Sequence, residues 1–270
     1  MHNPLLVATA TVAMLAAAGP ATAAEDVLNV YNWSDYIHED TVPEFEKEFG
    51  LEINYDVYDS NEVLEGKLMA GNTGFDVVYP SGGFFAQQIK AGIYQKLDKS
   101  KIPNLKHVDE GILERVAKFD PGNKYGVPYM WGTTGIGYNV DMVKKHIDGE
   151  IPENSWDLIF DPKYAKQLQD CGITMLDAPT EAFPIMKNYL GIDPESEDPE
   201  DLEKAKKALR EIRPYIKYYH SSKYINDLAN GDICVAQGWS GDVYIARDRG
   251  AAKENPVNID YSIPKEGTLI

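Results

Sequence analysis

The sequence has few of the residues on which metal and thiol chemistry depend. Its 270 residues include two cysteines and five histidines, and the histidines are scattered without the spacing of a metal site. A Walker-type phosphate loop, a His-Glu-x-x-His helix and a complete Gly-x-Ser-x-Gly elbow are missing as well. Residues 238–242 come close to the elbow, but Asp242 stands where it needs glycine. An enzyme therefore remains only a secondary hypothesis.

Basic residues are also scarce relative to acidic ones. There are 26 Lys and Arg residues against 43 Asp and Glu residues, which gives a formal net charge of −17. A chain this acidic has no electrostatic affinity for nucleic acid or for an anionic membrane surface. Its charge is compatible with a cationic ligand without identifying one. The densest acidic run, residues 193–203, is interpreted as a solvated loop that leads into a helix over 202–210.

The only long apolar stretch lies at the N-terminus. Residues 5–18 are apolar or small, and Ala21-Thr22-Ala23 has the small-x-small pattern of a signal-peptidase site. The stretch is shorter than the roughly 20 apolar residues that a membrane-spanning helix needs. The sequence predicts a signal peptide over residues 1–23 and an exported, freely diffusing protein, because no cysteine follows the cleavage site to carry a lipid.

Export decides the interpretation of the two cysteines. Cys171 and Cys234 form an even pair in an oxidising compartment, where one disulfide is the default. A metal site would need further ligands, and a catalytic cysteine would need a histidine that the neighbouring sequence does not supply. We therefore expect a Cys171–Cys234 disulfide.

Strands and helices alternate along the first part of the chain. Strands are predicted over 28–31, 51–57 and 75–79, with helices over 42–49, 59–71 and 84–90. The second helix has Asp59 as its predicted cap and Glu62 as the reciprocal N3 acid. This β-α-β-α-β order implies a parallel sheet with helices on both faces.

The second part of the chain repeats the α/β pattern after an extended middle. Extended runs over 125–131 and 135–139 precede strands near 173–176 and 233–236, and a strand over 257–263 then turns back. We expect a first lobe over 25–131, a second lobe over 132–250, and a return toward the first lobe over 251–270.

Residues 32–36, Asn-Trp-Ser-Asp-Tyr, follow the first predicted strand. The carboxyl end of a strand is where an α/β protein forms its ligand crevice. Aromatic faces attract an alkylammonium ion by roughly 0.5–2 kcal/mol each, and a carboxylate adds a charge-assisted hydrogen bond. The alternative is a plain strand-to-helix turn in which Trp33 packs in the core and Ser34 or Asp35 caps a helix. The same combination returns as Trp-Ser-Gly-Asp over 239–242, which favours a cation site.

Several long motifs together resemble one family. They are YNWSDYI over 31–37, DSNEVLEGKL over 59–68, PYMW over 128–131 with GIGYN over 135–139, SSKYINDLANGD over 221–232, and SIPKEG over 262–267. These strings resemble the polyamine-binding proteins of bacterial ABC importers, and in particular their putrescine-binding branch. The resemblance implies a type II periplasmic-binding fold: two α/β lobes with parallel-rich sheets flanked by helices, closing on the ligand about a hinge.

The resemblance also implies a set of ligand-binding residues. They are Trp33, Ser34, Asp35, Tyr36, Ser81, Glu181, Trp239 and Asp242. Two alternatives stay open, because Ser81 is equally suited to cap a helix and Glu181 to be a first-turn helix acid. Gly82 and Gly83 stand where the branch often has larger residues. The chain stops at Ile270, before the family's further aromatic-x-Asp ligand pair and its closing helices, so the resemblance implies a C-terminally incomplete member that binds putrescine weakly or not at all.

The function implied is transport. A periplasmic monomer would capture putrescine, or spermidine, and deliver it to the membrane permease of an ABC transporter, without a cofactor, a metal or any chemical step. A diamine needs an acid at each end and flat aromatic walls along its apolar chain, and the implied residues provide both. The alternatives are a binding protein for another cationic solute and an exported hydrolase with paired carboxylates.

Overall fold

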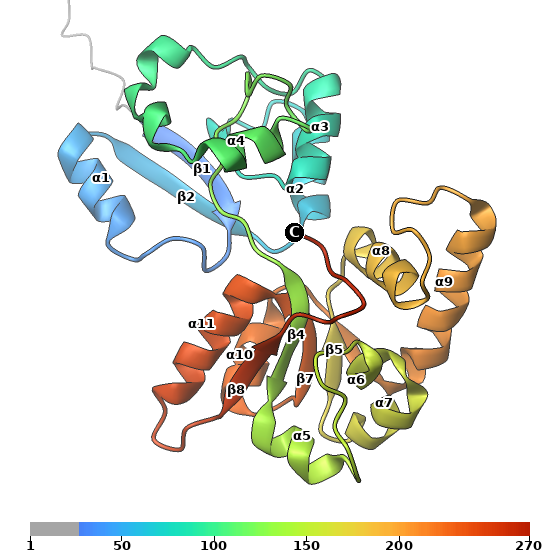
Figure 1. Cartoon of the computed structure of the whole chain (residues 1–270). Helices are drawn as coiled ribbons and strands as arrows, with labels where there is room; N and C mark the ends of the chain where they lie inside the picture. The colour runs from blue at the N-terminus through green and yellow to red at the C-terminus, as the bar shows by residue number, and fades with distance from the viewer. Residues whose placement is uncertain (1–26) are drawn as a thin grey trace, which may run out of the picture.

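The chain forms two α/β lobes that lie one above the other (Figure 1). The computed structural model describes residues 27–270, and the predicted signal peptide lies outside the described residues. The first lobe is built on a three-stranded sheet in the order β2–β1–β3, and the second on a five-stranded sheet in the order β6–β5–β7–β4–β8. The predicted two-lobed α/β architecture is confirmed.

The first lobe has the predicted parallel sheet. The central strand β1 (Val27–Trp33) is parallel to both β2 (Glu52–Tyr58) and β3 (Val77–Val78). The helical segments of this lobe are α1 (Thr41–Phe49), α2 (Asn61–Ala70), α3 (Gly82–Lys90), η1 (Lys99–Lys101), η2 (Pro103–His107) and α4 (Glu110–Val116). The chain then runs down from α4 into the second lobe (Figure 1).

Two predicted boundaries in the first lobe are wrong. The cap of α2 is Ser60, whose hydroxyl accepts the Val63 N–H at 3.3 Å, so the predicted Asp59–Glu62 cap is one residue too early. β3 is only two residues long, against a predicted strand over 75–79. The Asp76 carboxylate accepts the Asn29 N–H at 2.8 Å and thereby replaces a ladder bond to β1.

The second lobe contains a mixed sheet and most of the helices. Its elements are β4 (Thr134–Asn139), α5 (Val140–His146), α6 (Asp157–Phe160), α7 (Pro162–Leu168), β5 (Ile173–Met175), α8 (Pro179–Tyr189), α9 (Pro199–Ile212), η3 (Arg213–Tyr215), β6 (Ile216–Tyr219), α10 (Lys223–Asn230), β7 (Val235–Trp239), α11 (Ser240–Ala251) and β8 (Ile259–Ser262). β5 is parallel to β6 and β7, whereas β4 is antiparallel to β7 and β8.

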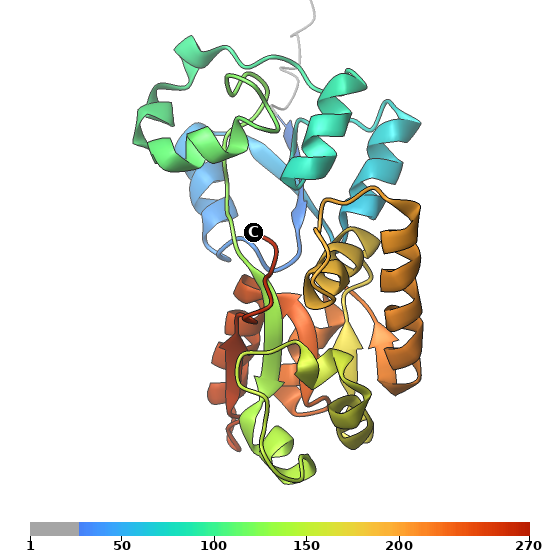
Figure 2. The same ribbon diagram turned by 45° about the vertical axis from the view of Figure 1, so that its right-hand side comes forward.

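The segment after β8 lies along the strand that enters the second lobe. The strand predicted over 257–263 forms as β8 and pairs with β4 at the edge of the second sheet. The following residues run back beside the start of β4, where the Thr134 N–H donates to the Leu269 carbonyl at 3.0 Å (Figure 2). The end of the described chain therefore lies where the lobes meet.

The core of the second lobe lies around β5 and β7. All three residues of β5 are buried, and so are the first four of β7. The predicted disulfide is confirmed: Cys171 and Cys234 are bonded, with their Cα atoms 5.5 Å apart. The bond joins the segments that lead into β5 and β7. None of the helices within residues 27–270 combines the length and apolar character needed to cross a membrane.

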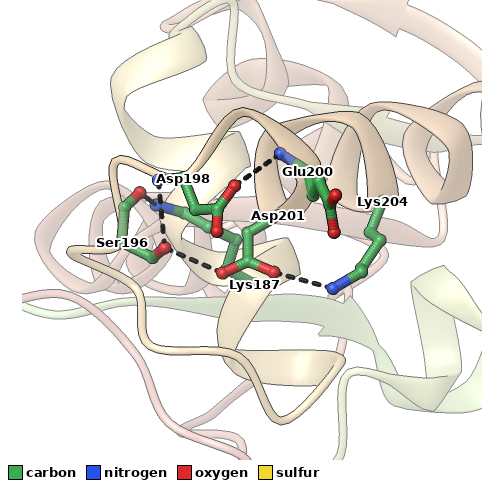
Figure 3. A network of polar contacts seen from close by, with 6 residues as sticks. All are labelled: Lys187, Ser196, Asp198, Glu200, Asp201 and Lys204. Atoms are coloured by element: carbon green, nitrogen blue, oxygen red, sulfur yellow. Dashed lines mark hydrogen bonds and ion pairs between the residues drawn. The ribbon is translucent and has the colours of Figure 1, made fainter.

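The acidic run before α9 is tied to its surroundings by a local polar network (Figure 3). The Asp198 carboxylate caps the helix, which starts at Pro199 and is longer than predicted. The ammonium of buried Lys187 donates to the Ser196 carbonyl at 3.0 Å, and the Ser196 hydroxyl donates to Asp201 at 2.8 Å. The acidic residues of this run therefore have a structural role, as a helix cap and as hydrogen-bond partners.

Candidate ligand-binding site

Asp242 is a buried acid at the border between the lobes. It lies in the first turn of α11, directly after β7, and only 2 % of it is exposed. Tyr36 of the first lobe donates its hydroxyl to Oδ1 at 2.6 Å, and Tyr224 of α10 donates to Oδ2 at 2.6 Å. An ionised carboxylate accepts about four hydrogen bonds, so both oxygens retain capacity for a cation.

The surroundings of Asp242 bring its titration close to neutral pH. Burial raises the pKa of Asp242 to about 6, even though the hydrogen bonds from Tyr224 and Tyr36 lower it. The neighbouring charge of Asp35 raises this pKa further, and that of Arg249 lowers it. The carboxylate is therefore ionised at neutral pH and is protonated in mild acid, and a cation beside it would favour the ionised form.

Two tryptophans from different lobes meet at the same border. The rings of Trp33 and Trp239 are 5.4 Å apart at an interplanar angle of 77°. The Trp33 indole N–H donates to the Tyr79 carbonyl at 2.7 Å, and its ring also packs against Tyr58, so Trp33 serves the first-lobe core as well as the border. Trp239 is the last residue of β7. The structure thus brings together aromatic side chains that lie far apart in the sequence.

Asp35 is paired across the border with an arginine. Its carboxylate accepts a hydrogen bond from Arg249 of α11, whose other nitrogen donates to the Asn226 side chain at 3.1 Å. The backbone at Asp35 has a positive φ of 65°, which marks a sharp turn after β1. Asp40, rather than Ser34 or Asp35, occupies the N-cap position of α1, which removes the capping alternative. A cation bound at Asp35 would have to share it with Arg249.

Glu181 lies next to the second tryptophan. It is in the first turn of α8 and accepts a hydrogen bond from the Thr134 hydroxyl at 2.7 Å. Thr134 and Trp239 are cross-strand partners on β4 and β7. Burial raises the pKa of Glu181, hydrogen bonding from Thr134 and Trp239 lowers it, and Glu62 of the first lobe raises it. Glu181 is therefore a first-turn helix acid at the border, and its contact with a ligand stays a prediction.

Ser81 and Ser34 lie nearby on the first lobe. Ser81 precedes α3, and its hydroxyl accepts the Asn61 side-chain N–H at 3.0 Å, so it is bonded to α2 rather than to the N–H groups of α3. Ser34 donates its backbone N–H to the Tyr58 carbonyl at 3.0 Å. Ligand contacts from both serines stay predictions. Packing requires a glycine at position 82, because a Cβ there would lie 2.4 Å from the Phe119 ring.

Sequence reasoning missed three side chains of this border. Tyr224, Thr134 and Arg249 each bond to a predicted site residue. Tyr224 lies within the matching motif 221–232, which is the only sequence signal for it. The other two carry no signal, because their partners lie 47 and 214 residues away along the chain.

Two other kinds of site would compete with this border in the described chain, a metal-ion site and a surface depression. Within residues 27–270, no cluster of His, Cys, Asp and Glu side chains could hold a metal ion. A depression lined by Glu150, Asn154, Asp157 and Lys265 contains none of the eight predicted ligand residues of the described chain. The lobe border is therefore the candidate site.

Comparison with known proteins shows the family of this chain. The family of bacterial extracellular solute-binding proteins matches residues 40–270. The chain is 54% identical to the putrescine-binding periplasmic protein SpuD of Pseudomonas aeruginosa, over 93% of this chain and 68% of that protein. It is also 54% identical to the putrescine-binding periplasmic protein PotF of Escherichia coli, over 95% of this chain and 70% of that protein.

A solved structure shows the same architecture. It is the spermidine/putrescine ABC transporter substrate-binding protein PotD of Streptococcus pneumoniae, which superposes with a TM-score of 0.65 at 29% identity. The match covers 90% of this chain and 69% of that one. The type II periplasmic-binding fold implied by the motifs is confirmed. The chain belongs to the bacterial extracellular solute-binding proteins.

Proposed function

We propose that this protein captures putrescine, or spermidine, in the periplasm and delivers it to the permease of an ABC transporter. The observation that carries the proposal is that a buried carboxylate, Asp242, and the paired rings of Trp33 and Trp239 lie on the same lobe border. The names of the relatives, which are putrescine-binding periplasmic proteins, support the same ligand. In this proposal the protein acts as a monomer after cleavage of residues 1–23, and it performs no chemistry.

The chemistry of a diamine matches the arrangement of the site. Each ammonium group offers three donors, and burying one without partners costs several kcal/mol. Asp242 would bind one ammonium, and Glu181 or Asp35 would lie toward the other. The two tryptophans would cover the apolar chain between them. The remaining predicted contacts are those of Ser34, Tyr36 and Ser81.

Movement of the lobes would complete the site. We propose that residues 25–131 and 132–250 close on the ligand about the segment that joins them, with 251–270 returning toward the first lobe. Closure excludes water and lowers the local dielectric constant, which strengthens each contact between the ammonium groups and the acids. Hydrogen bonds and ion pairs across the border, such as Tyr36–Asp242, are compatible with such a closed arrangement.

Calorimetric titration with putrescine tests this function. Asp242→Asn keeps the shape of the side chain and removes its charge, so it should weaken binding by about 1.5–3 kcal/mol, or roughly 10- to 150-fold in Kd. Asp248→Asn is the matched control, because Asp248 lies on the same helix with its side chain 81 % exposed and should leave the affinity unchanged. Equal putrescine affinity in the wild type and Asp242→Asn would contradict the assignment.

The same titration separates the alternatives. Spermidine, other diamines and an amino acid are tested in parallel, and stronger binding of a different cation would replace putrescine as the ligand. Recovery of the ligand unchanged after long incubation is expected of a transport protein, whereas its conversion would support the hydrolase hypothesis. N-terminal sequencing of the exported protein would locate the cleavage site.

A further inference from the structure

Tyr224 stands behind the candidate site and connects two of its residues. It lies on α10 with its side chain fully buried. Its hydroxyl donates to Asp242 Oδ2 at 2.6 Å and accepts the backbone N–H of Trp239 at 3.0 Å. One hydroxyl therefore joins the acid at the start of α11 to the tryptophan at the end of β7.

Tyr224 is closely packed on the side of β7. Its ring lies against the backbone of β7, where a Cβ at Gly238 would come within 2.5 Å of the ring and 2.9 Å of the hydroxyl. Only glycine fits this close approach. The ring is fully buried against this backbone, and its hydroxyl uses both a donor and an acceptor function, so it ties the positions of its two partners to each other.

The two phenols that bond to Asp242 differ in origin. Tyr36 belongs to the first lobe, so its bond to Asp242 exists only while the lobes are together. Tyr224 belongs to the same lobe as Asp242, and its bond persists whatever the first lobe does. The orientation of the acid before ligand arrives is therefore set from within the second lobe.

We propose that Tyr224 is a positioning residue of the ligand site: its hydroxyl holds the Asp242 carboxylate and the Trp239 backbone in the orientation that faces the first lobe. Tyr224 does not itself touch the ligand. The identity of the cation rests on the proposed function, but the positioning role does not, because the bonds involved lie within the protein.

The positioning role has a consequence for the titration of Asp242. The charged and titratable groups that face this carboxylate are Tyr224, Tyr36, Asp35 and Arg249. Burial raises the pKa of Asp242, and the hydrogen bond from Tyr224 is the largest influence that lowers it. Removal of the Tyr224 hydroxyl should therefore move the pKa of Asp242 further upward, by about one to two pH units for the loss of one hydrogen bond to a charged group.

The test compares Tyr224→Phe with Tyr218→Phe in the ligand-free protein. Tyr218 is a matched control, because its hydroxyl also donates to a carboxylate, that of Asp227, at 2.6 Å. Carboxyl ¹³C NMR follows the titration of Asp242, whose signal is assigned by its loss in Asp242→Asn. We expect a raised midpoint in Tyr224→Phe and an unchanged midpoint in Tyr218→Phe. An unchanged midpoint in folded Tyr224→Phe would overturn the proposal.

A second measurement covers the case in which Tyr224→Phe does not fold. In the wild type, the hydroxyl proton of Tyr224 and the amide proton of Trp239 should shift with the same midpoint as Asp242. If these two proton signals do not shift as Asp242 titrates, the proposal is overturned without the need for any variant. Putrescine titration is run alongside on the chain fused, after Ile270, to the part of PotF that follows its matched region. Absence of binding there would contradict the proposed function, while the ligand-free titration still decides the role of Tyr224.

Discussion

The two lobes contribute to one site but differ greatly in how well they are packed. The second lobe contains two clusters of 20 and 11 buried residues, which surround β5 and β7. The cluster of the first lobe, as described from residue 27 onward, has four: Tyr31, Tyr58, Leu64 and Leu68. No residue within α1 is buried, and the tilted rings of Phe45 and Phe49 pack against each other at its surface.

The better-packed second lobe is the more rigid side of the site. Burial of apolar surface contributes roughly 25 cal/mol per Å², so the second lobe is the more stable unit and the first opens at lower cost. The second lobe holds Asp242, Glu181, Trp239 and Tyr224 in place. The first lobe contributes Trp33 and Tyr36, at and just after the end of β1. Its helices α1 and α2 expose large apolar side chains, since Phe49 is 58 % and Met69 is 50 % exposed.

The largest expected effect on putrescine binding comes from covering the exposed apolar surface of the first lobe with additional chain. The chain spans 70% of its relative PotF, and exposed apolar side chains gather on the first lobe. We expect that fusing, after Ile270, the part of PotF that follows its matched region will raise amide-exchange protection in α1 and greatly strengthen putrescine binding. Thermal melting with and without putrescine checks this. A cooperative transition of the 270-residue chain that putrescine alone raises strongly would show that the first lobe needs no such cover.

The next effect concerns the second lobe. Cys171 and Cys234 close a loop with a sequence separation of 63. In the chain-entropy model such a bond adds about 4 kcal/mol, so the double substitution to serine should lower the free energy of unfolding by about that amount. Urea unfolding measures it, with the reduced wild type as control. Two free thiols in the oxidised protein under denaturing conditions would refute the bond.

A smaller effect is expected from the buried acid. The folded-state pKa of Asp242 is raised to about 6, above the unfolded value of 3.8, so its ionisation opposes folding. The protonated carboxyl favours the folded state. Its contribution to stability is fully present below pH 3.8 and is lost as the pH rises through 6, a change of about 3 kcal/mol. We expect the difference in unfolding free energy between wild type and Asp242→Asn to follow this course. A difference that is constant with pH would show that Asp242 titrates normally.

The smallest effect is that of the ion pair across the border. The side chains of Arg249 and Asp35 are 40 % and 29 % exposed, and pairs in water contribute less than about 1 kcal/mol. Arg249→Gln should weaken putrescine binding by less than about fivefold. Arg247→Gln, on the same helix but paired only with its neighbour Asp248, should have no effect. Equal losses in both variants would show that the Arg249 pair does not couple the lobes.

The disulfide of the second lobe could be predicted because an exported chain with two cysteines has one possible pairing. The parallel order of the first sheet could be predicted because it follows from the β-α-β-α-β order of the sequence. The boundaries at Ser60 and β3 were missed because single side-chain bonds, from Ser60 to Val63 and from Asp76 to Asn29, decide them. Family motifs predicted both Asp242 and Tyr36 as ligand residues, but not the hydrogen bond between them, because they lie 206 residues apart. Tyr224 could not be separated from an ordinary core tyrosine, since only the folded chain places its hydroxyl between Asp242 and Trp239.

If an ionised Asp242 binds a cation between the lobes, the affinity for putrescine must depend on pH. Because the pKa of Asp242 is raised to about 6, protons compete with the ligand below that value. Calorimetry between about pH 7.5 and pH 4.5 should show an affinity that is level above pH 6 and then falls roughly tenfold per pH unit. An affinity for putrescine that stays constant across this range would show that binding does not depend on an ionised Asp242.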